Sequence, residues 1–272
     1  MTSSGADAGD GGDGESTVRV AAAQFEPRPG DVRWNISRVL ELVSRAGVGG
    51  ADLVVLPELA TTGYYMFERF HQLAEPLDGP TVTILAELAR RYDLRVVLGL
   101  AERGEDGRVH DTAVLVGPGG LEGAYRKVHL WDTEKDVFTP GEATVVLDTG
   151  GPLGHLGLLV CYDLEFPATV EEVGAAGASI LAAPAAFGNL TLWRATLENR
   201  ARDLGIPIVA ANRLGLELDT EFCGHSTVMG ADGAVVADAG GEAGLVVTEL
   251  ELDLSGRSRP QRDPRLIHPE FG

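Results

Sequence analysis

Residues 157–167 read GLLVCYDLEFP, a short apolar run that ends at Cys161 and is followed by a polar turn. The run predicts a buried strand, and Pro167 predicts the first turn of a helix, where proline is well tolerated. This order of elements would present the Cys161 thiol at a sheet edge beside backbone N–H groups. Such groups can lower the pKa of a thiol and bind an oxyanion, so Cys161 is a candidate nucleophile. The alternative is an inert buried cysteine, because free cysteine is among the most buried residue types.

Glu58 lies at the end of a second apolar segment. Residues 51–56 read ADLVVL, a continuous run typical of a strand that is covered on both faces, and LPELATTGY spans residues 56–64. The carboxylate therefore falls at the C-terminal edge of a sheet, where α/β proteins keep their ligand sites. Taken alone, Glu58 could also be a solvated loop residue.

Lys127 ends one strand of a predicted hairpin. The segment YRKVHLW covers residues 125–131, and Glu134 follows shortly after it. Residues 112–116 and 122–127 flank the turn sequence GPGG, which is typical of a β-hairpin. By itself, Lys127 would be interpreted as an ordinary exposed lysine.

The rest of the chain alternates β-rich apolar runs with amphipathic stretches. Helices are predicted over residues 35–46, 81–92, 167–176 and 192–203, and further strands over 18–24, 95–100, 145–147, 155–160, 179–183, 206–211 and 244–252. A second hairpin, over 226–229 and 234–237, has signals similar to the first and suggests two related halves. No Pro- or Ser-rich linker separates them, so residues 17–272 are interpreted as one α/β domain. Two sheets with helices on their outer faces would accommodate this order.

Composition excludes several classes of protein. The chain has 272 residues and a formal net charge of −19, which disfavours binding to nucleic acid and anionic membranes. No apolar run approaches the roughly 20 residues of a membrane-spanning helix. Residues 1–16 are rich in Gly, Asp and Ser and lack the regions of a signal peptide, so we expect a disordered tail there. A C-terminal arm is expected from about residue 255.

Cys223 is the only other cysteine in the sequence. With two cysteines a disulfide framework is not expected, and the lack of an export signal favours a reducing cytoplasm. Residues 223–225 read CGH, but a zinc site needs three or four ligands with recognisable spacing. No glycine-rich phosphate-binding motif is present either. We therefore expect no metal and no cofactor.

Together, the three segments make the chain resemble the nitrilase superfamily of carbon–nitrogen hydrolases from about residue 18 to about residue 252. LPEL with TTGY, YRKVHL with a following Glu, and VCYDLEFP occur in the family's order. Weaker similarities are found at residues 183–187 (APAAF), Trp193, residues 200–201 (RA), residues 210–213 (AANR), Gly224 and Ser226. Any one of these matches is weak, whereas their conjunction is specific.

The resemblance implies an α-β-β-α sandwich and hydrolysis of a carboxamide through a cysteine thioester. Glu58 would be the base and Cys161 the nucleophile, while Lys127 and the backbone N–H of Tyr162 would hold the oxyanion. Glu134 would position the substrate amide or the lysine.

Three further side chains are expected at the substrate site, and they are Tyr64, Phe187 and Glu165. In one branch of the family an Arg occupies the Glu165 position. An acidic group there would favour a substrate that carries an amine, unless Glu165 points away and pairs with a nearby Arg. Family members commonly pair through helices, so we expect a homodimer or higher oligomer that acts on a small-molecule amide.

Other functions remain open at this point. Nitrile hydrolysis and decarbamoylation of an N-carbamoyl compound would use the same site, although the Cys-Tyr-Asp context looks more like the amidase branches. A protein that keeps the fold only for binding or assembly is a further alternative. The presence of Cys161, Glu58 and Lys127 together favours an enzyme.

Overall fold

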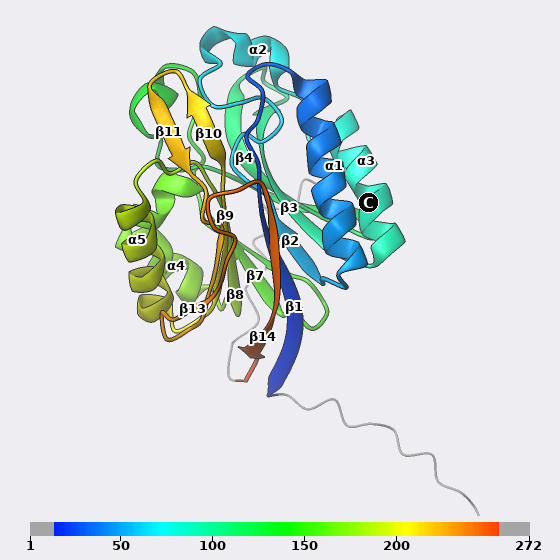
Figure 1. The fold of residues 1–272 in the computed structure, drawn as a ribbon, viewed down its shortest axis with the longest axis vertical. Coiled ribbons are helices and arrows are strands. Elements are labelled where there is room, and N and C mark those ends of the chain that lie inside the picture. The colour runs from blue at the N-terminus through cyan, green and yellow to red at the C-terminus, as the bar shows by residue number, and fades with distance from the viewer. Residues whose placement is uncertain (1–13, 256–272) are drawn as a thin grey trace, which may run out of the picture.

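Two six-stranded β-sheets lie face to face between two layers of helices in the computed structural model, which describes residues 14–255 (Figure 1). Helices α1 and α3 lie on one side of the pair of sheets, and α4 and α5 lie on the other (Figure 1). The α-β-β-α sandwich predicted from the sequence is therefore confirmed.

The first sheet has the strand order β14-β1-β2-β3-β4-β5. Its elements and those between them are β1 (Glu15–Gln24), α1 (Val32–Val48), β2 (Leu53–Val55), η1 (Phe67–Arg69), α2 (Phe70–Leu73), α3 (Pro80–Tyr92), β3 (Arg95–Arg103), β4 (Val109–Gly117), β5 (Gly120–Arg126) and, from the far end of the chain, β14 (Gly244–Asp253).

The second sheet has the order β13-β12-β9-β8-β7-β6. Its elements and those that connect them are η2 (Asp132–Asp136), β6 (Val145–Asp148), β7 (His155–Leu158), η3 (Cys161–Glu165), α4 (Pro167–Ala175), β8 (Ile180–Ala185), α5 (Leu190–Leu204), β9 (Ile208–Asn212), β12 (Thr227–Met229) and β13 (Val235–Asp238). A separate two-stranded ribbon, β10 (Leu214–Glu217) and β11 (Thr220–Cys223), follows β9.

Both sheets have the same arrangement of strands. Each contains three adjacent parallel strands, which are β1, β2 and β3 in the first sheet and β7, β8 and β9 in the second. One antiparallel strand flanks each trio on one side, and an antiparallel hairpin flanks it on the other. The hairpins are β4–β5 and β12–β13, the two that the turn sequences predicted. This repetition matches the two related halves suggested by the sequence.

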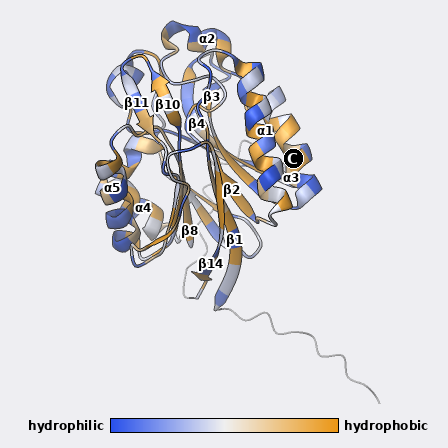
Figure 2. Ribbon diagram, viewed as in Figure 1, coloured by the Kyte–Doolittle hydropathy of each residue, from blue (hydrophilic) through white to orange (hydrophobic). Residues whose placement is uncertain are grey.

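The core lies between the sheets and beneath the helices. Val20 and Ala22 of β1 belong to the cluster shared with the second sheet, whereas Ala21 and Ala23 belong to the cluster beneath α1 and α3. Successive side chains of a strand point to opposite faces, so a strand covered on both faces is apolar throughout. Figure 2 shows the hydrophobic colour concentrated on the strands between the helix layers.

Element boundaries differ from the predicted ones in places. Helix α1 begins three residues early because the Asp31 carboxylate accepts a hydrogen bond from the Trp34 N–H (3.1 Å) and caps the helix. Strand β1 begins at Glu15, so the last two residues of the predicted 1–16 tail pair with β14 instead. Residues 1–13 and almost all of the expected C-terminal arm lie outside the described residues. Within residues 14–255, no helix is long and apolar enough to cross a membrane.

Gly99 of β3 allows the chain that carries Glu58 to pass close to the sheet. A Cβ atom at Gly99 would lie 2.5 Å from the Glu58 Cα and 2.7 Å from the Pro57 carbonyl oxygen. The Gly99 N–H donates to that carbonyl (3.2 Å), and its own carbonyl accepts from the Ala60 N–H (2.9 Å). The backbone around Glu58 is thus fixed against β3 at van der Waals distance.

Gly99→Ala should therefore lower the free energy of unfolding by about 1–3 kcal/mol, since the clash is with backbone atoms that cannot rotate away. Urea denaturation measures this change. Gly119→Ala is the matched control, because a Cβ at Gly119 would meet nothing within 4 Å. Equal stability of the two variants would contradict the close approach.

Candidate active site

The three segments singled out in the sequence meet at one edge of the two sheets. Glu58 follows β2, Lys127 follows β5, and Cys161 follows β7 as the first residue of η3. All three side chains are buried, with exposed fractions of 0%, 1% and 6%. The carboxyl ends of β2, β5 and β7 thus bring a carboxylate, an ammonium and a thiol together.

Lys127 is held by two carboxylates. Its Nζ lies 2.5 Å from Glu58 Oε1 and 2.7 Å from Glu134 Oε1, and a third carboxylate, Asp111, lies 3.6 Å away. Glu134 also accepts from the Tyr64 hydroxyl (2.5 Å) and the Trp131 N–H (2.8 Å). Burial alone would lower the pKa of Lys127, but the charges of Glu134 and Glu58 raise it well above its ordinary value. The side chain is therefore a fixed cation.

Oxygen atoms of Glu58, Asp111 and Glu134 lie within 4.8 Å of one another, the kind of spacing that can hold a metal ion. The Lys127 ammonium already contacts all three carboxylates. A metal ion would compete with that fixed positive charge for the same oxygens. The donor set therefore fits a lysine better than a metal.

Glu58 and Cys161 have electrostatic properties suited to a proton transfer. Burial raises the pKa of the Cys161 thiol well above its ordinary value, and the charge of Glu58 raises it further, so the resting thiol is neutral. Burial also raises the pKa of Glu58, although Lys127 opposes this shift. Within the described chain, Glu58 Oε2 is buried and has no hydrogen-bond donor. That oxygen is free to accept a proton.

The turn at Cys161 exposes backbone N–H groups beside the thiol. Cys161 has φ 46°, a left-handed conformation that is strained for a residue with a side chain. The Cys161 Sγ accepts from the Ala186 N–H at 3.5 Å. The Tyr162 N–H, in the first turn of η3, is bonded to no acceptor among residues 14–255. It is thus available to an anionic oxygen near the sulfur.

A model of the carbon–nitrogen hydrolase family matches residues 19–260. The chain belongs to this family. An (R)-stereoselective amidase of Pseudomonas sp. is 34% identical over 90% of this chain and 89% of the relative. A nitrilase of Pyrococcus abyssi is 35% identical over 89% of this chain and 93% of the relative.

Solved structures give the same result for this carbon–nitrogen hydrolase. An amidase from Nesterenkonia sp. is 33% identical, with a TM-score of 0.79 over 86% of this chain and 90% of the other. A mutant amidase from Nesterenkonia sp. AN1, with the same identity, coverage and TM-score, shows the acetamide moiety of fluoroacetamide added covalently at its active-site cysteine.

The predicted substrate-site residues have different surroundings. The Tyr64 hydroxyl bonds to Glu134, and its ring packs against Phe222. Phe187 is 6% exposed and packs on Trp193. The Tyr162 ring is half-buried and meets Phe166 edge to face. Tyr64 therefore touches the ionic cluster directly, whereas the Phe187 and Tyr162 rings pack on aromatic neighbours.

Glu165 ends η3 and is half-buried. Its carboxylate has no hydrogen-bond or ion-pair partner in the described part of the chain, and burial raises its pKa. Arg200 on α5 instead bonds to the Leu164 carbonyl and to Asp203. Among residues 14–255, Glu165 does not form the pairing with a nearby Arg that the sequence left open.

A buried ion pair fixes the backbone at Tyr64. Arg213 and Glu217 are almost fully buried, with Nη1 and Oε2 separated by 2.7 Å. Glu217 also accepts from the backbone N–H groups of Tyr64 and Tyr65. Glu217 belongs to the β10–β11 ribbon, which the sequence analysis did not predict. An acidic residue at the end of a four-residue strand gave no signal of this role.

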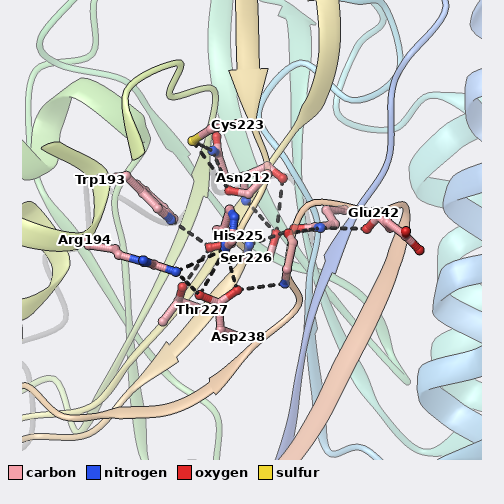
Figure 3. A network of polar contacts seen from close by, with 12 residues as sticks. Trp193, Arg194, Asn212, Cys223, His225, Ser226, Thr227, Asp238 and Glu242 are labelled. Atoms are coloured by element: carbon pink, nitrogen blue, oxygen red, sulfur yellow. Dashed lines mark hydrogen bonds and ion pairs between the residues drawn. The ribbon is translucent and has the colours of Figure 1, made fainter. Parts of the chain in front are cut away.

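Cys223-Gly224-His225 is part of a hydrogen-bond network (Figure 3). Within the part of the chain that the structure describes, the only group of three or more possible metal ligands is that of Glu58, Asp111 and Glu134. His225 Nδ1 lies 2.9 Å from Asp238, and Cys223 Sγ lies 3.2 Å from the Phe187 carbonyl. Asn212 Oδ1 accepts from the Phe187 N–H (2.6 Å), so the network holds the chain next to the Ala186 N–H. The role of Cys223 here is structural.

Asp163 connects the nucleophile turn to the lysine segment, and the sequence analysis assigned it no role. It is fully buried and accepts hydrogen bonds from the Tyr125 hydroxyl (2.8 Å), the His129 N–H (2.8 Å) and the Val160 N–H (3.2 Å). A charged residue two positions after a buried cysteine is the signal that could have indicated it, because buried charges require partners.

Asp163→Ala should leave these buried donors unpaired, each at a cost of about 1–3 kcal/mol. We expect a loss of several kcal/mol in the free energy of unfolding and a shifted η3 turn. Denaturation and the rate of thiol alkylation measure the two effects. Asp78→Ala, which removes an exposed aspartate, should change neither quantity, and a variant of Asp163 that behaved like this control would refute the connection.

Proposed function

We propose that this carbon–nitrogen hydrolase is an amidase, which converts a small carboxamide to a carboxylic acid and ammonia or an amine through a thioester on Cys161. The observation that carries the proposal is a neutral buried thiol beside a buried carboxylate with one unpartnered oxygen. The acetamide adduct on the cysteine of the Nesterenkonia enzyme supports the same chemistry.

The first step is proton transfer from the thiol. Because the Cys161 thiol is neutral at rest, it needs a base before it can attack, and Glu58 is the base. Proton transfer to Glu58 creates a thiolate, which attacks the amide carbonyl carbon. The ion pair with Lys127 holds Glu58 in place during the transfer.

The attack pushes the carbonyl electrons onto oxygen and forms a tetrahedral oxyanion. The Lys127 ammonium and the Tyr162 N–H stabilise this charge. Glu134 and Tyr64 do not react; they hold Lys127 in position through Glu134 Oε1. The left-handed backbone conformation of Cys161 directs both its sulfur and the following Tyr162 N–H toward the substrate carbonyl group.

Collapse of the intermediate breaks the C–N bond. Glu58 now carries the thiol proton and donates it to the leaving amine, which departs and leaves a thioester on Cys161. Glu58 then removes a proton from water, and the resulting hydroxide attacks the thioester. The C–S bond breaks, the acid is released, and Glu58 returns its proton to the Cys161 thiolate. One water is consumed for each amide cleaved.

Nitrile hydrolysis is the second candidate, since the Pyrococcus abyssi relative is a nitrilase. A thiolate can add to a nitrile carbon as it adds to an amide carbonyl carbon. Parallel assays of an aliphatic amide, the matching nitrile and an N-carbamoyl amino acid separate these activities by the ammonia each releases. Turnover of the nitrile alone would replace the amidase proposal.

We also propose that the protein acts in the reducing cytoplasm as a homodimer or higher homo-oligomer. A reduced thiol is required for the mechanism, and both cysteines are free in the structure. Helices on the outer faces of the sandwich are the surfaces through which the resemblance implies pairing. Sedimentation velocity of the full chain measures the oligomer.

Cys161→Ala should abolish amide hydrolysis, while Cys223→Ser should retain most of it. The serine keeps a donor for the Phe187 carbonyl, which accepts from Cys223 in the wild type. The assay is ammonia release from a panel of carboxamides, with folding of each variant checked by thermal denaturation. Similar losses in two folded variants would refute Cys161 as the single nucleophile.

Glu165 should favour substrates that carry an amine. Its unpaired carboxylate would attract a cationic substrate such as an amino-acid amide and repel the monoamide of a dicarboxylic acid. The ratio of kcat/KM for these two substrates should fall in Glu165→Gln, with a neutral aliphatic amide as the internal control. An unchanged ratio, or efficient wild-type turnover of the dicarboxylic monoamide, would contradict this preference.

A further inference from the structure

Asp111 is a buried carboxyl group beside the site for which the mechanism above has no use. It lies on β4, where its carbonyl accepts from the Lys127 N–H (2.8 Å) and its residue pairs in register with Ala101 of β3. The side chain is about 1% exposed. Both of its carboxyl oxygens lack a hydrogen-bond donor among the described residues.

The charges around Asp111 do not balance if every group is ionised. Three carboxylates surround one ammonium, so the cluster would carry a net charge of −2 in a buried site. The nearby Arg213 does not correct this, because Glu217 already pairs with it. Uncompensated buried charge is costly, and a carboxyl group avoids the cost by binding a proton.

The hydrogen bonds show where an extra proton fits. Glu134 accepts from Lys127, Tyr64 and Trp131, so it is fully supplied with donors as a carboxylate. Glu58 Oε2 and both oxygens of Asp111 have no donor among residues 14–255. A proton between these two groups would supply an O–H donor to one and an acceptor to the other.

We propose that Asp111 is a protonated positioning residue that donates a hydrogen bond to Glu58 Oε2 and keeps Glu58 ionised and oriented. Asp111 is the neutral partner because it lies farther from Lys127, 3.6 Å against 2.5 Å for Glu58. A carboxylate oxygen has two lone pairs, so Oε2 can accept this bond and still receive the thiol proton.

Electrostatics agree with the geometry. Burial raises the pKa of Asp111 well above its ordinary value, and the charge of Glu58 raises it further. The titratable and charged groups that face the pair are Lys127, Glu134, Cys161, Tyr64 and Arg213. A hydrogen bond to the ionised form of an acid lowers its pKa, so Asp111 would offset part of the effect of burial on Glu58.

Two substitutions distinguish a neutral Asp111 from an ionised one, and the activity readout rests on the proposed amidase function. Asp111→Asn is neutral and keeps a hydrogen-bond donor. The low-pH side of the plot of kcat/KM against pH, which reports the pKa of Glu58, should therefore stay at its wild-type position. Asp111→Ala removes the donor and should move that side of the plot to higher pH by about one unit. A shift to lower pH in Asp111→Asn would mean that a negative charge was lost, and would overturn the proposal.

Infrared spectroscopy of the full chain tests the proton without any turnover. At neutral pH, the wild type should show the carbonyl stretch of a buried protonated carboxylic acid, and the band should be missing from Asp111→Asn and present in the exposed control Asp78→Asn. Absence of the band in the wild type would overturn the proposal even if amides are hydrolysed. Its presence in a protein that hydrolyses no amide would sustain Asp111 and refute the function instead.

Discussion

The burial of Lys127 is the constraint on which the rest of the site depends. An ammonium removed from water loses several kcal/mol of solvation, which only close and well-oriented carboxylates recover. Its two short ion pairs come from Glu58 and Glu134, which lie on different segments of the chain. Removal of either carboxylate would leave the buried ammonium with a single short ion pair. The cluster therefore fixes the relative positions of the loop after β2, the end of β5 and η2 before any substrate binds.

The second sheet contributes the thiol, and a single aspartate joins it to the first. Asp163 sits beside Cys161 on η3 and accepts from Tyr125 of β5 and from His129 beyond it. The Glu58 N–H also donates a hydrogen bond to the Ala185 carbonyl at the end of β8 (3.4 Å). The base and the nucleophile come from different sheets, so their separation depends on how the two sheets pack. A change in the packing between the two sheets would therefore change the geometry of the active site.

Local signals predicted the layers, whereas the three central side chains were predicted from the conjunction of motifs that resembles the family, since Glu58 and Lys127 taken alone gave no functional signal. Continuous apolar runs indicate strands covered on both faces, and turn residues mark both hairpins. Asp111, Asp163 and the Arg213–Glu217 pair were missed for a different reason. Asp111 is far in the chain from Glu58, Asp163 from Tyr125, and Glu217 from the Tyr64 N–H that it binds. A lone acidic residue in a sequence looks the same whether it contacts water or a buried donor. The two strands of the β10–β11 ribbon have only four residues each, too few for a periodic pattern to indicate them.

Strand β14 gives the molecule an unusual order of assembly. It completes the first sheet by pairing with β1 over ten residues, although the two strands lie near opposite ends of the chain. All strands of the second sheet lie between them in the sequence. During synthesis, the edge of β1 that pairs with β14 keeps its backbone N–H and C=O groups unpaired until nearly the whole chain has emerged. Contacts between segments so far apart in the sequence form slowly. A bare edge is a template for pairing with another chain, so the newly made protein is most prone to aggregate before its own last strand arrives.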